Sequence, residues 1–160
     1  MERIEKILNH DLFKYYVLEN EKEEKNRLFC HHDMGHFLDV ARIARILNLE
    51  EKAGLDAEIV YAAALLHDIG RHLQYREKIS HEEASAMLAP RILQECGYKE
   101  EEQEEILFAI AAHRDREKAS ERTLAEILYR ADKLSRPCFC CKQESNCNWK
   151  QEKKNRTLRY

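Results

Sequence analysis

The chain has 160 residues, with 27 basic and 30 acidic side chains and a formal net charge of −3. A chain of this length forms one domain that buries roughly two thirds of its unfolded surface, so a core needs no disulfide bonds. The near balance of charge argues against a protein that coats nucleic acid, because phosphate binding requires a surplus of cations. Four glycines and two prolines disfavour a sheet sandwich or barrel and favour an all-α fold.

No apolar run approaches the ~18 residues that cross a bilayer. The first six residues, MERIEK, are charged and do not resemble a signal peptide. We therefore expect a cytoplasmic protein with no membrane partner. In that compartment cysteines serve as thiols or metal ligands rather than as disulfides. The eight histidines and six cysteines are the unusual part of the composition.

The first predicted helices follow from apolar spacing. Helical spacing extends from residue 2 to about 26, and the charge run from Glu19 to Lys25 indicates a solvated helix end. A second helix is predicted over about 32–48, because Phe37, Val40 and later apolar residues recur at steps of three and four. This stripe predicts one buried face.

Cap residues and turn residues delimit the next two helices. Asp56 is a candidate N-cap for a helix that Gly70 ends. Residues 80–83 (SHEE) match a capping box, which predicts a helix start, and Gly97 marks the end of that helix. Pro90 lies inside it, so we expect a kink or a split into two helices.

Two more helices are predicted over about 100–113, which opens with acidic residues, and over about 122–136. We find no internal repeat and no strand pair. The composition changes at Pro137, where four cysteines and then a tail rich in lysine and arginine follow. We therefore divide the chain into a helical domain, 1–136, and a cysteine-rich segment with a basic tail, 137–160.

Histidine and aspartate recur on the apolar faces of these helices. His67 and Asp132 each lie four residues after an apolar residue of their stripe, so both side chains point where the helix points its core face. His36 and His113 extend apolar stripes in the same way. A single buried histidine is usually a satisfied core residue, but an unpaired buried aspartate costs several kcal/mol.

Two interpretations of Asp132 follow. An ion pair with Arg130 or Arg136 would neutralise the carboxylate without a metal. A metal centre would explain more, because four helices each place a histidine or an aspartate on the inward side, and these residue types bind divalent transition metals.

Three segments resemble the HD-domain metal-dependent phosphohydrolases. Residues 36–41 (HFLDVA) resemble the opening histidine motif of that family, and residues 65–70 (LLHDIG) resemble its defining His-Asp doublet. Residues 131–134 (ADKL) resemble its closing aspartate. The similarity extends over about residues 30–136. It implies an all-α HD-domain helical bundle with a central metal site.

The resemblance also implies a ligand set. The two-metal members of the family, which include bacterial diadenosine tetraphosphate hydrolases and cyclic di-GMP phosphodiesterases, add histidines and bridge both ions with the doublet aspartate. The first type is the nearer match, because the second has paired histidines where this chain has His113 and Arg114, and its Gly-Tyr-Pro signature is absent. The implied metal ligands are His36, His67, Asp68, His81, His113 and Asp132.

The implied activity is a metal-dependent phosphohydrolase, which cleaves a phosphate ester or phosphoanhydride of a nucleotide-like small molecule with a metal-activated water. The cofactor would be one or two divalent ions of Fe, Mn, Co, Ni or Zn. Nucleic acid is not an expected partner, and the oligomeric state is open. The alternative is a non-catalytic, regulatory module that binds metal and nucleotide and interacts through its cysteine-rich end.

Cations near the centre would stabilise charge on phosphate oxygens. We expect catalytic roles for Asp68, Arg71 and Lys133, although many family members carry lysine where this chain has Arg71. Each cation could instead be an exposed helix-end residue. The candidate substrate contacts are Arg71, Arg114, Arg116 and Lys133; His32 and Asp33 are candidates for orienting the ligands, and His10, His31 and His72 are expected on the surface.

The cysteine-rich segment allows three interpretations. Cys138 and Cys141 form a C-x-x-C unit, with Cys140 between them and Cys147 further on. Such spacing can hold a structural zinc or a redox-active iron through thiolates. The same cysteines could instead remain reduced thiols, with Cys147 and Trp149 packing the tail onto the domain.

In the third interpretation, the segment covers the metal cleft and brings Lys150, Lys153 or Lys154 towards substrate phosphates. Cys30 and Cys96 lie outside the segment, and we expect them to be ordinary buried or half-buried thiols.

Overall fold

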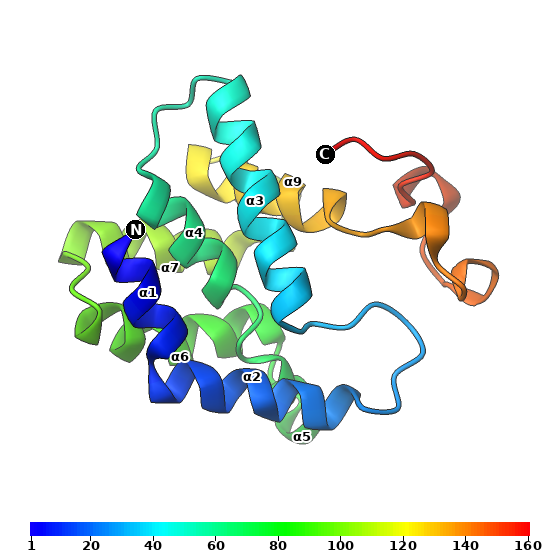
Figure 1. Cartoon of the computed structure of the whole chain (residues 1–160), viewed down its shortest axis with the longest axis horizontal. Coiled ribbons are helices and arrows are strands. Elements are labelled where there is room, and N and C mark those ends of the chain that lie inside the picture. The colour runs from blue at the N-terminus through cyan, green and yellow to red at the C-terminus, as the bar shows by residue number, and fades with distance from the viewer.

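The computed structural model describes all residues of the chain, 1–160, and contains helices and turns but no strand (Figure 1). The predicted all-α class is therefore confirmed. The helices are α1 (Glu2–Asn9), α2 (Asp11–Glu24), α3 (Met34–Glu50), α4 (Ala57–Leu66), α5 (Arg71–Glu77), α6 (His81–Glu95), α7 (Glu100–Ala112), α8 (Arg116–Ala119) and α9 (Thr123–Leu134), followed by the 3₁₀ turns η1 (Cys138–Cys140), η2 (Glu144–Asn146) and η3 (Gln151–Lys153).

Helix α4 lies at the centre of the bundle. Val60 and every residue from Ala62 to Leu66 are buried, so the helix is apolar on all sides, which is the pattern of an enclosed helix. Helices α3, α7 and α9 pack against it, and Figure 1 shows α3 crossing close to it. The C-terminal end of α4, which leads into His67 and Asp68, is thereby held inside the bundle.

The turn after α4 depends on Gly70. The helix ends at Leu66, earlier than predicted, and residues 67–70 form a turn before α5. A Cβ atom on Gly70 would lie 2.5 Å from the backbone nitrogen of Ser85 and 2.6 Å from the Cβ of Ala84. The Gly70 N–H donates to Ser85 Oγ at 2.9 Å. Gly70 therefore allows α6 to approach the turn, and it is not the cap of α4.

The predicted single helix over 2–26 is wrong. His10 has extended backbone angles and separates α1 from α2, and its Nδ1 accepts a hydrogen bond from Leu12 N at 3.2 Å. The predicted solvated helix end is confirmed only in part: the outward residues of the run from Glu19 to Lys25 are exposed, but Glu19, Asn20 and Glu24 are buried. The inward side of α2 thus carries polar groups toward the centre of the molecule.

Other helix boundaries agree with the predictions in part. The Asp56 side chain caps α4, and Gly97 ends α6 with a φ of +86°. The predicted helix start is confirmed, because Ser80 is the N-cap of α6. Its side chain makes no capping hydrogen bond, and α6 continues past Pro90 as one helix, so the predicted capping box and split are wrong. Helices α5 and α8 were not predicted, because seven and four residues are too few for a clear apolar period.

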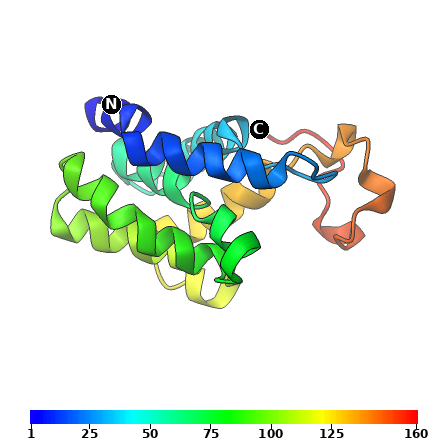
Figure 2. The same ribbon diagram turned by 90° about the horizontal axis from the view of Figure 1, so that it is seen from below.

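The segment 137–160 lies at one end of the bundle in both views of the fold (Figures 1 and 2). The Asn155 side-chain amide donates to the carbonyls of Lys133 and Arg136, both at 2.9 Å, and so ties the segment to the end of α9. Lys154 Nζ is bound by the backbone and the side chain of Glu144. The proposed division at residue 136 stays a prediction.

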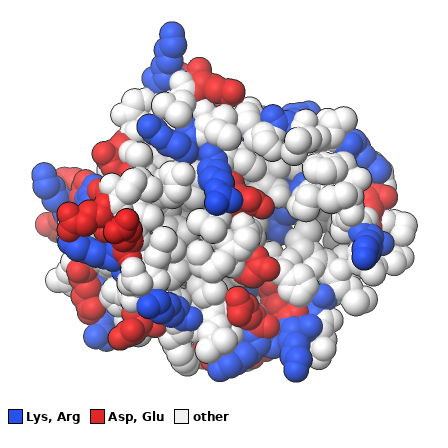
Figure 3. All heavy atoms as spheres, viewed as in Figure 1, with Lys and Arg blue, Asp and Glu red and all other residues white.

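None of the helices combines the length and the apolar character needed to cross a membrane. On the face drawn in Figure 3, lysine and arginine side chains are interspersed with aspartate and glutamate. That face carries no continuous basic stripe of the kind that tracks a nucleic-acid backbone.

Candidate metal centre

Three imidazole rings meet one oxygen of the Asp68 carboxylate. Asp68 Oδ2 lies 3.3 Å from His67 Nε2. It lies 3.7 Å from His32 Nε2 and 3.8 Å from His36 Nε2. All four side chains are at most 9% exposed. The loop before α3, the first turn of α3 and the turn after α4 therefore contribute to one buried site.

The other oxygen of Asp68 faces two further histidines. Asp68 Oδ1 lies 3.2 Å from His81 Nε2, at the start of α6, and 3.6 Å from His113 Nε2, at the end of α7. Asp132 on α9 completes the site, with its Oδ1 3.5 Å from His36 Nε2. The six predicted ligands are thus brought together, with Asp68 between two sets of nitrogens.

Hydrogen bonds on the outer nitrogen of each ring fix which nitrogen points inward. His67 Nδ1 lies 2.6 Å from Ala64 O, and His113 Nδ1 lies 2.6 Å from Ile110 O. A carbonyl oxygen can only accept, so Nδ1 carries a proton in both rings, and Nε2 is the nitrogen whose lone pair faces the centre when the ring is neutral. This tautomer is the one that binds a metal through Nε2.

The other three rings are anchored by side chains. His32 Nδ1 is bound to Glu24 Oε1 at 2.6 Å. His81 Nδ1 lies 2.7 Å from Gln74 Oε1, and His36 Nδ1 lies 3.3 Å from Ser135 Oγ. Partners of this kind orient metal-bound histidines.

The donor atoms fit a divalent metal because several of them have no other partner. His36 Nε2, His67 Nε2 and Asp68 Oδ1 are buried and form no hydrogen bond within the protein. Buried polar atoms without a partner are costly, and metal ions bound at the centre would satisfy all three. Two groups have donor atoms within 4.8 Å of one another: His36, His67 and Asp132, and His67, Asp68 and His113.

Charge and burial set the protonation of the site. Burial alone would raise the pKa of Asp68, but the positive charge of His67 and His32 lowers it well below its usual range. Burial, aided by Arg71, lowers the pKa of His81 to about 2, so this ring is neutral at pH 7. His67 is the exception: burial would lower its pKa, but Asp68 raises it, so metal binding displaces a proton there.

For Asp132 the sequence allowed an ion pair with an arginine or a place in a metal centre, and the structure is compatible with both. Arg136 Nη2 lies 3.0 Å from Asp132 Oδ1, and Lys133 Nζ lies 2.5 Å from Asp132 Oδ2. Arg130 instead pairs with Glu51, the residue directly after α3. The carboxylate is therefore held by an ion pair and also faces the histidines, so the ion pair does not exclude a metal.

Glu24 belongs to the site but was not predicted. It is 1% exposed and accepts hydrogen bonds from the His32 ring, the His32 backbone and the Tyr75 hydroxyl. The signal was in the sequence: residues 13, 17, 20 and 24 continue the spacing of one buried helical face. The charge run concealed this spacing.

Asn20, on the same face of α2, was also missed. Its Nδ2 donates to Asp68 O at 2.9 Å, and its Oδ1 accepts from the backbone N of His72 at 2.8 Å. His72 is 4% exposed and stacks on Tyr16, so the prediction that it lies on the surface is wrong. His31 is exposed, and the His10 ring lies at the edge of the molecule beside Glu95.

The predicted cations occupy different places. Arg71 lies against His81 Nδ1, and its buried Nε forms no hydrogen bond but lies 3.8 Å from Glu24 Oε1. Lys133 reaches Asp132, as described above, and is one-third exposed. Arg114 and Arg116 are exposed, and neither makes a hydrogen bond or ion pair with the site. Asp33 caps α3 by accepting from His36 N at 3.0 Å, which positions that ligand.

The six cysteines are free thiols in this structure, and none belongs to the two donor groups of the centre. The zinc site at the cysteine-rich segment stays a prediction. Lys154 is buried with its Nζ bound to Glu144, and it lines a cavity that His36 also lines. The expectation that the segment brings a lysine towards substrate phosphates stays a prediction.

The sequence matches the HD domain family over residues 33–136. It is 48% identical to an uncharacterized protein of Clostridium beijerinckii over 160 residues, which covers the whole of both chains. It is 37% identical to ribonuclease Y of Thermus thermophilus over 102 residues, which is 64% of this chain and 16% of that one. The 40% identity to ribonuclease Y of Cutibacterium acnes covers 51% of this chain and 14% of that one. No solved structure matches the chain.

Proposed function

The chain belongs to the HD-domain family, and on that premise we propose that it is a metal-dependent phosphohydrolase acting on a phosphate ester or phosphoanhydride of a nucleotide-like molecule. The observation that supports this most is the convergence of five histidine Nε2 atoms on the two oxygens of Asp68. The finer likeness to the diadenosine tetraphosphate hydrolases is part of this proposal.

The residues divide between two ions. His36, His67 and Asp132 would hold one ion, and His81 and His113 would hold the other, with one oxygen of Asp68 on each side. Bound ions of this kind act as Lewis acids on phosphate oxygens and acidify a water molecule. His32 Nε2 lies 3.7 Å from Asp68 Oδ2, about as far as the proposed ligand His36, and the hydrogen bond to Glu24 fixes the His32 ring.

Arg71 is the cation best placed to bind the substrate phosphate. Its side chain is 14% exposed and lies against His81, and its buried Nε forms no hydrogen bond and lies 3.8 Å from Glu24 Oε1. Its guanidinium offers donors in a fixed planar fork that matches phosphate oxygens. Lys133 would add a second positive charge on the Asp132 side of the centre. Both would stabilise charge that develops on the phosphoryl oxygens.

RNA phosphodiesters are a second candidate substrate. The relatives named ribonuclease Y favour this candidate, although this chain spans only 14 to 16% of the two described above. The mixed charge on the face drawn in Figure 3 favours a small substrate over a polynucleotide.

The test is hydrolysis by the purified chain, loaded in turn with Mn, Fe, Co or Ni, of a panel of nucleotides, dinucleoside polyphosphates and single-stranded RNA. We expect release of phosphate or nucleotide from a small substrate, and a loss of at least 100-fold in Asp68→Ala and His67→Ala. Arg130→Ala is the control, because Arg130 pairs with Glu51 away from the centre.

Equal activity in Asp68→Ala and in the wild type would refute the proposal. Cleavage of RNA alone would show that the substrate is an RNA phosphodiester and not a small nucleotide-like molecule. Tight binding of metal and nucleotide with no product from any substrate would favour the non-catalytic, regulatory alternative.

A further inference from the structure

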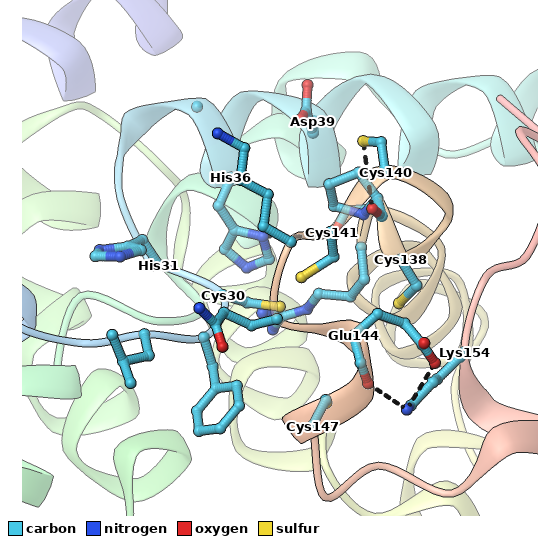
Figure 4. A pocket seen from close by; sticks show the side chains of 18 of the residues that line it. Cys30, His31, His36, Asp39, Cys138, Cys140, Cys141, Glu144, Cys147 and Lys154 are labelled. Atoms are coloured by element: carbon cyan, nitrogen blue, oxygen red, sulfur yellow. Dashed lines mark hydrogen bonds and ion pairs between the residues drawn. The ribbon is translucent and has the colours of Figure 1, made fainter.

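Five of the six cysteines line one cavity beside the metal centre. The cavity has a volume of about 420 Å³ and lies between the loop before α3 and the first part of the segment 137–160. Cys30 comes from the loop and the other four come from the segment (Figure 4). Two parts of the chain that are far apart in the sequence thus bring thiols to one place.

Four of these five thiols share the same degree of burial, and the fifth differs from them. Cys140 is exposed, and its Sγ donates to the carbonyl of Pro137, as the dashed line in Figure 4 marks. The four others are partly buried: Cys30, Cys138, Cys141 and Cys147. Cys96 is buried at the end of α6 and does not line this cavity.

The segment also lacks the apolar core that would hold it in place. None of its residues is a buried hydrophobic side chain, and Lys154 is its only buried residue. Its regular structure consists of three 3₁₀ turns. Small segments without a core are commonly held by a metal bound to cysteines, because few other interactions offset their chain entropy.

We propose that Cys30, Cys138, Cys141 and Cys147 bind one zinc ion, which fastens the segment 137–160 to the loop before α3. Four thiolates in a tetrahedron form the closed coordination of a structural zinc site. Zinc–sulfur bonds of about 2.3 Å place the sulfurs about 3.8 Å apart. No three sulfurs lie within 4.8 Å of one another in this structure, so binding would draw them inward and release thiol protons.

The proposed zinc site would also restrict the motion of two groups at one side of the His–Asp centre. Arg136 lines the same cavity, and its guanidinium lies beside Cys30 and donates to Asp132. His32 follows Cys30 by two residues. A zinc ion at Cys30 would therefore restrict both the loop that carries His32 and the arginine that holds Asp132.

The first test is cobalt substitution of the full chain. Cobalt bound to thiolates gives a strong charge-transfer absorption that cobalt bound to histidine and carboxylate does not give. We expect this absorption in the wild type and in Asp68→Ala, and its loss in Cys30→Ser and Cys147→Ser. Cys140→Ser and Cys96→Ser are the matched controls and should keep it. Retention of the absorption in Cys30→Ser, or its loss in Cys140→Ser, would overturn the proposal.

A second test needs no substitution, so it stays decisive if the serine variants misfold. The zinc-loaded wild type is alkylated with and without a chelator, and each cysteine is followed by mass spectrometry. We expect the four proposed ligands to react only after chelation, while Cys140 reacts in both states. Equal reactivity in both states would contradict a zinc site. A disulfide between two of the four, or an iron–sulfur cluster in the isolated protein, would also overturn it.

Discussion

Asp132 shows how one buried carboxylate can serve two purposes. Arg136 at Oδ1 and Lys133 at Oδ2 supply positive charge in the metal-free chain, while Oδ1 also faces His36 Nε2 at 3.5 Å. Burial would raise the pKa of Asp132, but Arg136 and Lys133 lower it well below the usual range. The carboxylate is therefore ionised and ready to bind a cation at neutral pH.

Replacing Arg136 tests this arrangement. Arg136→Met leaves Asp132 with one cation fewer, so we expect the free energy of unfolding of the metal-free chain to fall by about 3 kcal/mol. Metal should restore part of that loss, because it replaces the missing charge. Arg130→Met, at the half-exposed pair with Glu51, should cost less than about 1 kcal/mol. Urea unfolding with and without metal measures both variants, and equal losses in the two would contradict this account.

Glu24 gives the metal-free chain a specific sensitivity to acid. Burial would raise its pKa, but hydrogen bonds from His32 and Tyr75 lower it to about 2. A depressed carboxyl pKa adds stability above the unfolded pKa of about 4.3, and that stability is lost as the pH falls towards 2. Glu24→Gln should therefore be less stable at pH 6 and lose stability less steeply below pH 4.5 than the wild type.

Thermal unfolding across this pH range, with metal removed, measures the difference. Glu21→Gln on the same helix is the control, because Glu21 is exposed and its side chain forms no hydrogen bond or ion pair. A Glu24→Gln curve parallel to that of the wild type would contradict the role assigned to Glu24.

At the scale of elements, the contact between the turn 67–70 and α6 sets the distance between the two histidine sets. Gly70→Ala would place a Cβ atom 2.5 Å from Ser85 N, and overpacking of this kind costs about 1–3 kcal/mol. We expect α6 to shift and His81 to lose its place beside Asp68, so the variant should bind about one metal ion fewer than the wild type.

Gly54→Ala is the matched control for this variant. Gly54 has a φ of +75° and no atom within 4 Å of the added Cβ, so the substitution strains only the local backbone, by about 1 kcal/mol. Metal analysis should find it unchanged. An unchanged metal content in Gly70→Ala would show that α6 does not depend on this approach.

The sequence predicted those parts of the site that depend on helical period. His67 and Asp132 lie on apolar stripes, and the structure places both at the centre. Glu24 was missed because a charged residue on an apolar period looks solvated until its partner, His32, is brought next to it. The role of Gly70 was misread because the approach of α6 is a tertiary contact, which no local signal contains.

At the scale of the whole molecule, the segment 137–160 depends on few contacts. Asn155→Leu would remove the hydrogen bonds to the end of α9, with a cost of about 1–3 kcal/mol for the carbonyls left without a donor. We expect trypsin to cleave within the segment several times faster in this variant. Asn146→Ala, which removes one hydrogen bond from Asn146 to the Gln143 side chain, is the control. Equal cleavage rates would show that other contacts hold the segment.

The central claim is that Asp68 joins two sets of histidines around two metal ions. Manganese content per chain tests it most directly, because thiolates of the cysteine-rich segment have low preference for this ion. We predict about two Mn ions in the wild type, about one in His81→Ala, and none retained in Asp68→Ala. Equal manganese content in the wild type and Asp68→Ala would contradict the claim.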